Sequence, residues 1–291
     1  MNRKILADLG LLYCAMFWGL SFPTMKILVG IYPPCWLLFL RFSIGSLMIY
    51  AIFHKRINES FRKTFKGGFI IGVLLFLAIT TQTIGLRYIG GGRSAFISAT
   101  YVLMVPFMIW GLQRVFPGWL TIEAACLCVA GMYLLSGDEG AGPDGLTGDI
   151  LTLVCAFTFA VQVIAISRYT YKLDPVALSF AEFVSFSAMA LISSLIFESP
   201  SEYLSADGIP ELIFTIVFAT FGCYMVQIIS QKYAEPSHAT IIMSLESVFG
   251  LASSIVFLDE TVTARMLTGC ALIFAAVMIS ELSPFLLKKR R

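Results

Sequence analysis

The chain has 291 residues, of which 58% are apolar and 13% are charged, about half the charged share of an average soluble domain. A water-soluble protein of this length has no interior large enough for 25 Phe, 11 Tyr and 4 Trp beside so many aliphatic residues. The composition therefore excludes a soluble enzyme, a disordered chain and a nucleic-acid binder, and a net charge of +2 points to no charged partner. We expect an all-α integral membrane protein.

Ten stretches of the sequence are long and apolar enough to cross a bilayer as helices. A hydrocarbon core of about 30 Å needs about 20 residues at a rise of about 1.5 Å per residue. In chain order the predicted spans are 6–25, 34–53, 67–86, 94–113, 119–136, 149–168, 175–197, 210–231, 238–258 and 264–286. The longest connections are a basic one at 54–66 and acidic ones at 137–148 and 198–209. None of them is long enough for an extramembrane domain.

The distribution of Lys and Arg predicts the orientation of these spans. With the N-terminus in the cytoplasm, fifteen Lys and Arg fall in cytoplasmic segments and only four in external ones, a strong positive-inside bias. The four external residues are Lys26, Arg87, Arg93 and Arg265. An even number of spans then places both termini in the cytoplasm, with the basic tail 288–291 as an anchor. The expected location is the cell (inner) membrane.

Sliding the chain against itself indicates an internal duplication. The matches include Asp8 with Asp149, Cys14 with Cys155 and Pro34 with Pro175 at an offset of 141 residues, and Gln82 with Gln227 at an offset of 145 beyond the basic connection. Two predicted repeats of five spans follow, 1–136 and 149–287, joined by an external linker at 137–148. Because five is odd, the second repeat is inverted, the arrangement in which two halves meet around a site near the bilayer midplane.

Several short motifs accompany this layout. They are Trp18-Gly19-Leu20-Ser21-Phe22-Pro23 followed by Lys26, Phe39-Leu40-Arg41-Phe42, Leu245-Glu246-Ser247-Val248-Phe249-Gly250, and Leu258-Asp259-Glu260-Thr261. With the two five-span halves, they make the whole chain resemble the EamA-type members of the drug/metabolite transporter (DMT) superfamily. The resemblance implies a secondary transporter that exports a small polar or amphipathic metabolite, such as an amino acid, by alternating access. The family commonly has Pro where this chain has Ser247, so a kink in the ninth span stays open.

Four ionisable residues within predicted spans stand out: Arg41, Glu182 and Glu246, and Glu123 near the cytoplasmic start of the fifth span. A charge near the bilayer centre costs at least about 2.5–3.5 kcal/mol on insertion scales, so each is expected to face a partner or water. Arg41 and Glu182 occupy equivalent places in the two repeats, and an ion pair between them is one expectation. Arg41 is otherwise an anchor for a substrate carboxylate or phosphate. Glu246 is either a cation ligand or proton carrier, or a hydrogen-bonded link between helices. Glu182 is the second candidate for ion coupling.

Neutral side chains at similar depth complete the candidate site. The matched amides Gln82 and Gln227 are candidates to line a cavity, and Trp18, Tyr101 and Tyr224 are candidates for its aromatic walls. Simple packing remains the alternative for all five. The expected kinks or close helix contacts are at Gly19, Pro23, Pro106 and Gly250.

The sequence offers little for catalysis. It contains no G-x-x-x-x-G-K-[ST], H-E-x-x-H, G-x-S-x-G or G-x-G-D motif, and only two histidines, His54 and His238. We therefore expect no enzyme, no metal and no cofactor. The expected partners are a small-molecule substrate, membrane lipid and, if transport is coupled, protons; nucleic acid is not expected, and monomer and homodimer are both open. The alternative functions are an uncoupled facilitator of the same fold and a non-transporting scaffold or receptor.

Overall fold

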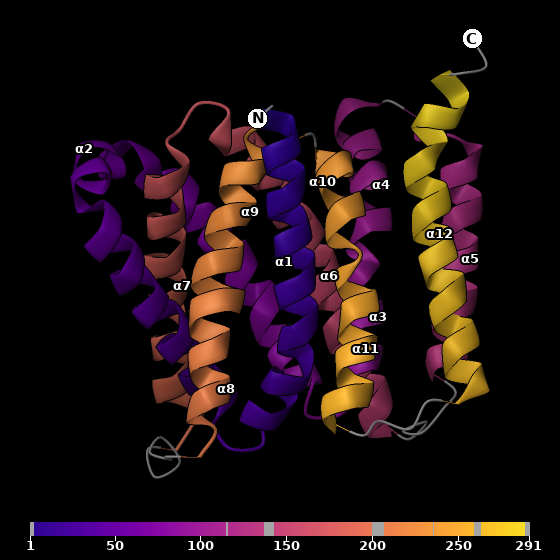
Figure 1. Cartoon of the computed structure of the whole chain (residues 1–291), viewed down its shortest axis with the longest axis horizontal. Coiled ribbons are helices and arrows are strands. Elements are labelled where there is room, and N and C mark those ends of the chain that lie inside the picture. The colour runs from indigo at the N-terminus through magenta and orange to yellow at the C-terminus, as the bar shows by residue number, and fades with distance from the viewer. Residues whose placement is uncertain are drawn as a thin grey trace.

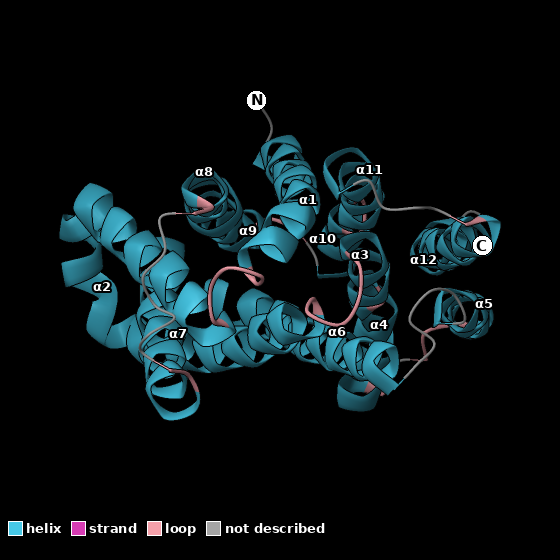
Figure 2. Ribbon diagram, turned by 90° about the horizontal axis from the view of Figure 1, so that it is seen from below, coloured by secondary structure: helices cyan, strands magenta, loops and turns pink. Residues whose placement is uncertain are grey.

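The computed structural model describes residues 3–114, 116–136, 143–199, 207–234, 236–258 and 263–288. Within these ranges every regular element is a helix, as the composition predicted, and the helices stand side by side in one bundle (Figure 1). Seen along the helices, α9, α1 and α11 form one row that faces α7 and α6, while α5 and α12 pair at one side (Figure 2). The first half of the predicted linker, 137–142, lies outside the described residues, and its second half, 143–148, is the beginning of a helix. The motif residues Asp259, Glu260 and Thr261 and the tail beyond residue 288 also lie outside the described residues.

The helices follow the predicted spans closely. They are α1 (Arg3–Leu28), α2 (Pro34–Gly85), α3 (Gly91–Ala99), α4 (Tyr101–Gln113), α5 (Trp119–Ser136), α6 (Pro143–Thr170), α7 (Pro175–Phe197), α8 (Ile209–Phe214), the π-helix η2 (Thr215–Gly222), α9 (Cys223–Gln231), α10 (Pro236–Met243), α11 (Glu246–Leu258) and α12 (Ala264–Lys288). In the described part of the chain, six helical stretches are long and apolar enough to cross a membrane, and shorter apolar helices occupy the fifth, ninth and tenth predicted spans. The chain is a multi-pass membrane protein, and ten crossings remain a prediction.

The predicted loop at 54–66 is wrong, because α2 continues through it to Gly85. This basic stretch contains neither Gly nor Pro and is rich in Lys, Arg and other helix formers, so nothing in it stops a helix. Only Phe53 departs from helical geometry (φ −122°, ψ 20°), and α2 bends there. Just beyond the bend, Arg56 forms a 2.6 Å ion pair with Asp174, the N-cap residue of α7.

Two of the spans are interrupted halfway along their length. The fourth breaks at Thr100 between α3 and α4, and the ninth breaks between α10 and α11. Hydroxyl groups bond to carbonyls of the preceding turn at both breaks: Thr100 Oγ1 donates to Ile97 O at 2.7 Å and Ser247 Oγ donates to Ser244 O at 2.8 Å. The ninth span breaks although Ser, not Pro, stands at position 247. Hydroxyl bonds of this kind also occur within unbroken helices, for example from Ser185 to Ala181 O in α7, so they accompany the breaks without explaining them.

Two contacts between an acidic and a basic side chain show how the repeats are related. Asp8 Oδ1 lies 2.9 Å from His238 Nε2, and Arg93 Nη2 lies 2.5 Å from Asp149 Oδ2. Asp8 matches Asp149 at the offset of 141 and Arg93 matches His238 at the offset of 145, so each contact is the image of the other. The first joins the starts of α1 and α10, at the end drawn uppermost in Figure 1 and called here the upper end; the second joins the starts of α3 and α6 at the lower end. One contact made at opposite ends of the bundle is what inverted repeats produce.

Candidate functional site

A cavity of about 50 Å³ lies inside the bundle, at and below the level of the helix breaks. At about 10–15 Å³ for each water it has room for about three to five waters. Its lining residues are Trp18, Ser21, Phe22, Met25, Arg41, Ile79, Gln82, Thr83, Leu86, Ser98, Tyr101, Cys155, Phe159, Tyr224 and Glu246. Six of the seven predicted substrate-binding residues are therefore brought together around one space, and Gln227 is not among them.

Arg41 is a buried cation with neutral partners. Its Nε donates to Thr220 Oγ1 at 3.0 Å, and its Nη1 donates to Met25 Sδ at 3.0 Å. The expected ion pair with Glu182 is wrong, since Glu182 instead accepts a 3.1 Å hydrogen bond from Gln162 Nε2. The guanidinium, bonded to α1 and η2, is therefore left without a carboxylate partner.

Arg41 and Glu182 face different neighbours, although α7 packs against both halves of α2. Glu182 lies against the second half of α2, where a Cβ added at Gly72 would come within 2.7 Å of Glu182 O. Arg41 belongs to the first half of α2, before the bend at Phe53. The two residues are equivalent by sequence, yet inversion gives each its own surroundings.

The π-helix η2 positions two cavity residues. Trp18 Nε1 donates to Ala219 O at 2.9 Å, and the next residue, Thr220, receives the Arg41 bond. A π-helix is wider than an α-helix and is often found at functional sites, because its geometry leaves carbonyl groups available to side chains. Nothing in the sequence indicated this role, since Thr215–Gly222 looks like any other apolar span segment.

Glu246 is the first residue of α11 and is buried at the edge of the cavity. Its carboxylate makes no hydrogen bond or ion pair with any residue that the structure describes. The N-terminal end of a helix favours a negative charge, because its free N–H groups carry a partial positive charge. Tyr101, the residue matched to Glu246 at the offset of 145, begins α4 in the same way and borders the same cavity.

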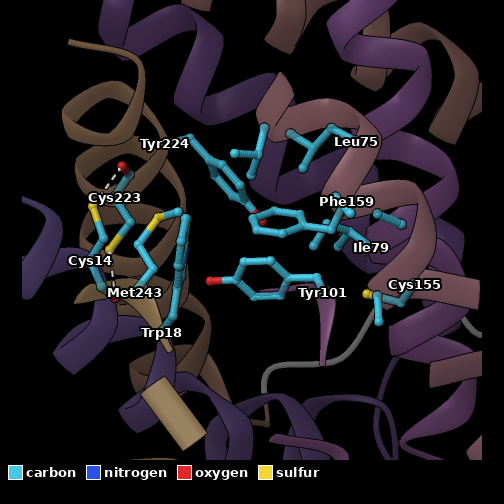
Figure 3. Packing of buried hydrophobic residues seen from close by; sticks show 14 of the residues in the cluster. Cys14, Trp18, Leu75, Ile79, Tyr101, Cys155, Phe159, Cys223, Tyr224 and Met243 are labelled. Carbon is cyan, nitrogen blue, oxygen red and sulfur yellow. Dashed lines mark hydrogen bonds between the residues drawn. The ribbon is translucent and has the colours of Figure 1, made fainter. Parts of the chain in front are cut away.

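Aromatic rings form one wall of the cavity. The ring centroids lie 4.9 Å apart for Tyr101 and Phe159, 5.1 Å for Trp18 and Tyr224, and 5.8 Å for Trp18 and Phe159. The Tyr101 hydroxyl points toward the indole of Trp18 (Figure 3). Phe159 was missed at the sequence level, although it is the residue that the duplication matches to Trp18. The wall is therefore built from both repeats.

Two predicted site residues lie away from the cavity. Glu182 and Gln227 are both fully buried. Glu182 Oε2 and both polar atoms of the Gln227 amide have no hydrogen-bond partner among the described residues. Neither residue is among those that line the cavity.

The model of the EamA-like transporter family matches residues 5–137 and again residues 146–282. The chain belongs to this family. The two matched stretches correspond to the family's two repeats, which confirms the resemblance found in the sequence.

The relatives of this EamA-like chain are themselves transporters by name. An uncharacterized transporter of Archaeoglobus fulgidus is 34% identical over 284 residues, covering 96% of this chain and 87% of the relative. The uncharacterized transporter YvbV of Bacillus subtilis (strain 168) is 25% identical over 274 residues, covering 92% and 89%. A protein crystal structure with 17% sequence identity has the same fold, with a TM-score of 0.72 over 97% of this chain and 98% of the other. The chain is a membrane transporter of the EamA-like family.

Proposed function

We propose that the protein is a secondary transporter that moves a small amino-acid-like solute across the cytoplasmic membrane by alternating access. The observation that carries the proposal is the central cavity, in which a buried guanidinium and a buried carboxylate both lack a charged partner in the described structure. Charged groups at membrane depth are costly and typically mark a substrate or ion pathway. A bound solute would supply the partners that the protein does not.

The chemistry of the lining suggests how a zwitterion would bind. Arg41 offers a planar guanidinium with free donors for a carboxylate, and Glu246 offers a carboxylate for an ammonium group. The rings of Trp18, Tyr101 and Tyr224 would cover the apolar part of the solute and add cation–π attraction for the amine. This pairing favours a solute with both charges over one with a single charge.

The size of the cavity supports a mechanism with moving helices. Space for a few waters is smaller than the volume of most metabolite pockets, which is about 300–1,000 Å³. Loading therefore requires helices to separate, and the breaks at Thr100 and before Glu246 are natural bending points. By the positive-inside bias the upper end is cytoplasmic, and export is the direction that the family resemblance implies.

Proton coupling and uncoupled facilitation are the two versions of this proposal. In the coupled version, Glu246 or Glu182 carries a proton in exchange for the solute. A pH-sensitive dye inside proteoliposomes would report proton movement on addition of solute. The coupled version predicts a signal that disappears in Glu246→Gln or Glu182→Gln, whereas a facilitator carries solute with no signal in any variant.

The substrate class is tested by counterflow in proteoliposomes with three versions of one amino acid: the free form, the C-terminal amide and the N-acetyl derivative. The free form should cross fastest. Arg41→Gln should remove the preference for the free form over the amide, and Glu246→Gln should remove its preference over the N-acetyl derivative. A scaffold or receptor would carry none of the three, and equal rates for all three would contradict the assignment of the two charges.

A further inference from the structure

The centre of the cavity is lined by equivalent residues of the two repeats, whereas the rest of the cavity lies toward one end of the bundle. We call two residues mates if they match at the offset of 141 in the first two spans of a repeat or 145 in the later ones. Three pairs of mates line the cavity together: Trp18 with Phe159, Ile79 with Tyr224, and Tyr101 with Glu246. The other lining residues include Met25 and Leu86, at the lower ends of α1 and α2. The cavity thus extends from the symmetry centre toward the lower end only.

The mates of these other lining residues are all packed in the opposite half. They are Cys14, Gln162, Val163, Ile166, Glu182, Gln227, Ile228, Gln231 and Met243, and none is more than 3% exposed. The positions equivalent to the one-sided part of the cavity are therefore buried above the centre.

Four of these packed mates are polar, and all four carry unsatisfied atoms. Gln162 Oε1, Glu182 Oε2 and both amide atoms of Gln227 and Gln231 have no hydrogen-bond partner among the described residues. Buried polar side-chain atoms are normally hydrogen-bonded, so four such residues from α6, α7 and α9 call for an explanation. The contact between Gln162 and Glu182 shows that residues of the set meet across helices.

We propose that Gln162, Glu182, Gln227 and Gln231 line a second half-site, the inverted image of the observed cavity, which opens at the upper end when the observed cavity closes. Water or solute would then satisfy the atoms that are unpartnered now. The half-site has three amide groups and, in Glu182, a carboxylate at the position that Arg41 occupies in the observed cavity. It is therefore suited to the ammonium end of a solute. The inference rests on the proposed alternating access.

Single cysteines test the half-site in a background in which the seven native cysteines are replaced. A charged, membrane-impermeant thiol reagent is applied to each side of reconstituted vesicles that carry Gln227→Cys or its mate Gln82→Cys. Ile229→Cys, on the exposed outer face of the same helix, is the matched control. We expect Gln227→Cys to react from the upper-end side at least tenfold faster than the control, and Gln82→Cys to react from the lower-end side.

The proposal is overturned if Gln227→Cys reacts no faster than Ile229→Cys under conditions in which the protein transports solute and Gln82→Cys reacts with the reagent. If Gln227→Cys does not fold, Gln231→Cys, one turn further along α9, gives the same test. Solute flux is measured in the same vesicles. Reaction at Gln227→Cys without flux of any solute through the unmodified protein would support the half-site and contradict the transport proposal, so the two failures are distinguishable.

Discussion

Replacing Gln227 by Leu should make the protein more stable and less active. The Gln227 side chain is fully buried, and its two polar atoms have no partner among the described residues. An unsatisfied buried polar group costs about 1–3 kcal/mol, and Leu fills a similar volume without that cost. The free energy of unfolding of Gln227→Leu should therefore rise by about 1–3 kcal/mol. The same free energy would favour the observed conformation over the proposed one in which the cavity opens at the upper end. It would shift the equilibrium between these two conformations by about 5- to 150-fold.

The assay pairs the unfolding midpoint in detergent with solute flux in proteoliposomes. Gln82→Leu is the matched control, because Gln82 borders the cavity and its amide is not among the buried unsatisfied groups, so its removal should give no gain in stability. The reasoning is refuted if Gln227→Leu lowers the midpoint. It is also refuted if the midpoint rises while flux stays at the level of the unsubstituted protein, since the amide would then have no part in transport.

The remaining predictions concern helix packing and the two matched contacts between an acidic and a basic side chain. Gly19→Ala should destabilise the protein by about 1–3 kcal/mol, because the added Cβ would lie 2.9 Å from Glu246 O. Gly111→Ala, whose added Cβ would have nothing within 4 Å, should stabilise it by up to about 1 kcal/mol through helix propensity. Equal unfolding midpoints for the two variants would contradict this packing. Asp149→Asn should lower the free energy of unfolding by about 3–5 kcal/mol, because it leaves the buried guanidinium of Arg93 without its carboxylate. Asp8→Asn removes the carboxylate of the equivalent, half-exposed contact with His238 and should lower the free energy of unfolding by about 1 kcal/mol or less. Equal decreases in the free energy of chemical unfolding for the two variants would show that burial does not change how much each contact contributes to stability.

The sequence predicted the fold well because its strongest signals concern the membrane. Apolar runs near 20 residues follow from bilayer thickness, and every predicted span is helical in the described structure apart from the breaks in the fourth and ninth. The loop expected at 54–66 failed for the same reason, since polarity was taken as the end of a helix although no helix-breaking residue was present. Polarity predicts where a helix leaves the bilayer, whereas Gly, Pro and capping residues determine where it stops.

The site was predicted in composition but not in geometry. Arg41, Glu246 and the aromatic residues could be found because charge and ring size at mid-span are unusual enough to stand out. The π-helix around Thr220 could not be found, since a shift from i−4 to i−5 bonding leaves no mark on an apolar run. Gln227 and Glu182 were expected beside their mates, yet in this structure Gln82 and Arg41 line the cavity whereas Gln227 and Glu182 are packed, so equivalence in sequence does not give equivalence in exposure.

The central claim is that cargo pauses in the observed cavity on its way across the membrane. Cys155 tests this directly, because its thiol lies on the cavity wall and becomes the sole reporter when the other cysteines are replaced. The claim predicts that a transported solute slows modification of Cys155 by a thiol reagent, with a half-maximal concentration close to that for flux, and that modification stops flux. Complete modification that leaves flux intact, at a rate unaffected by solute, would contradict it.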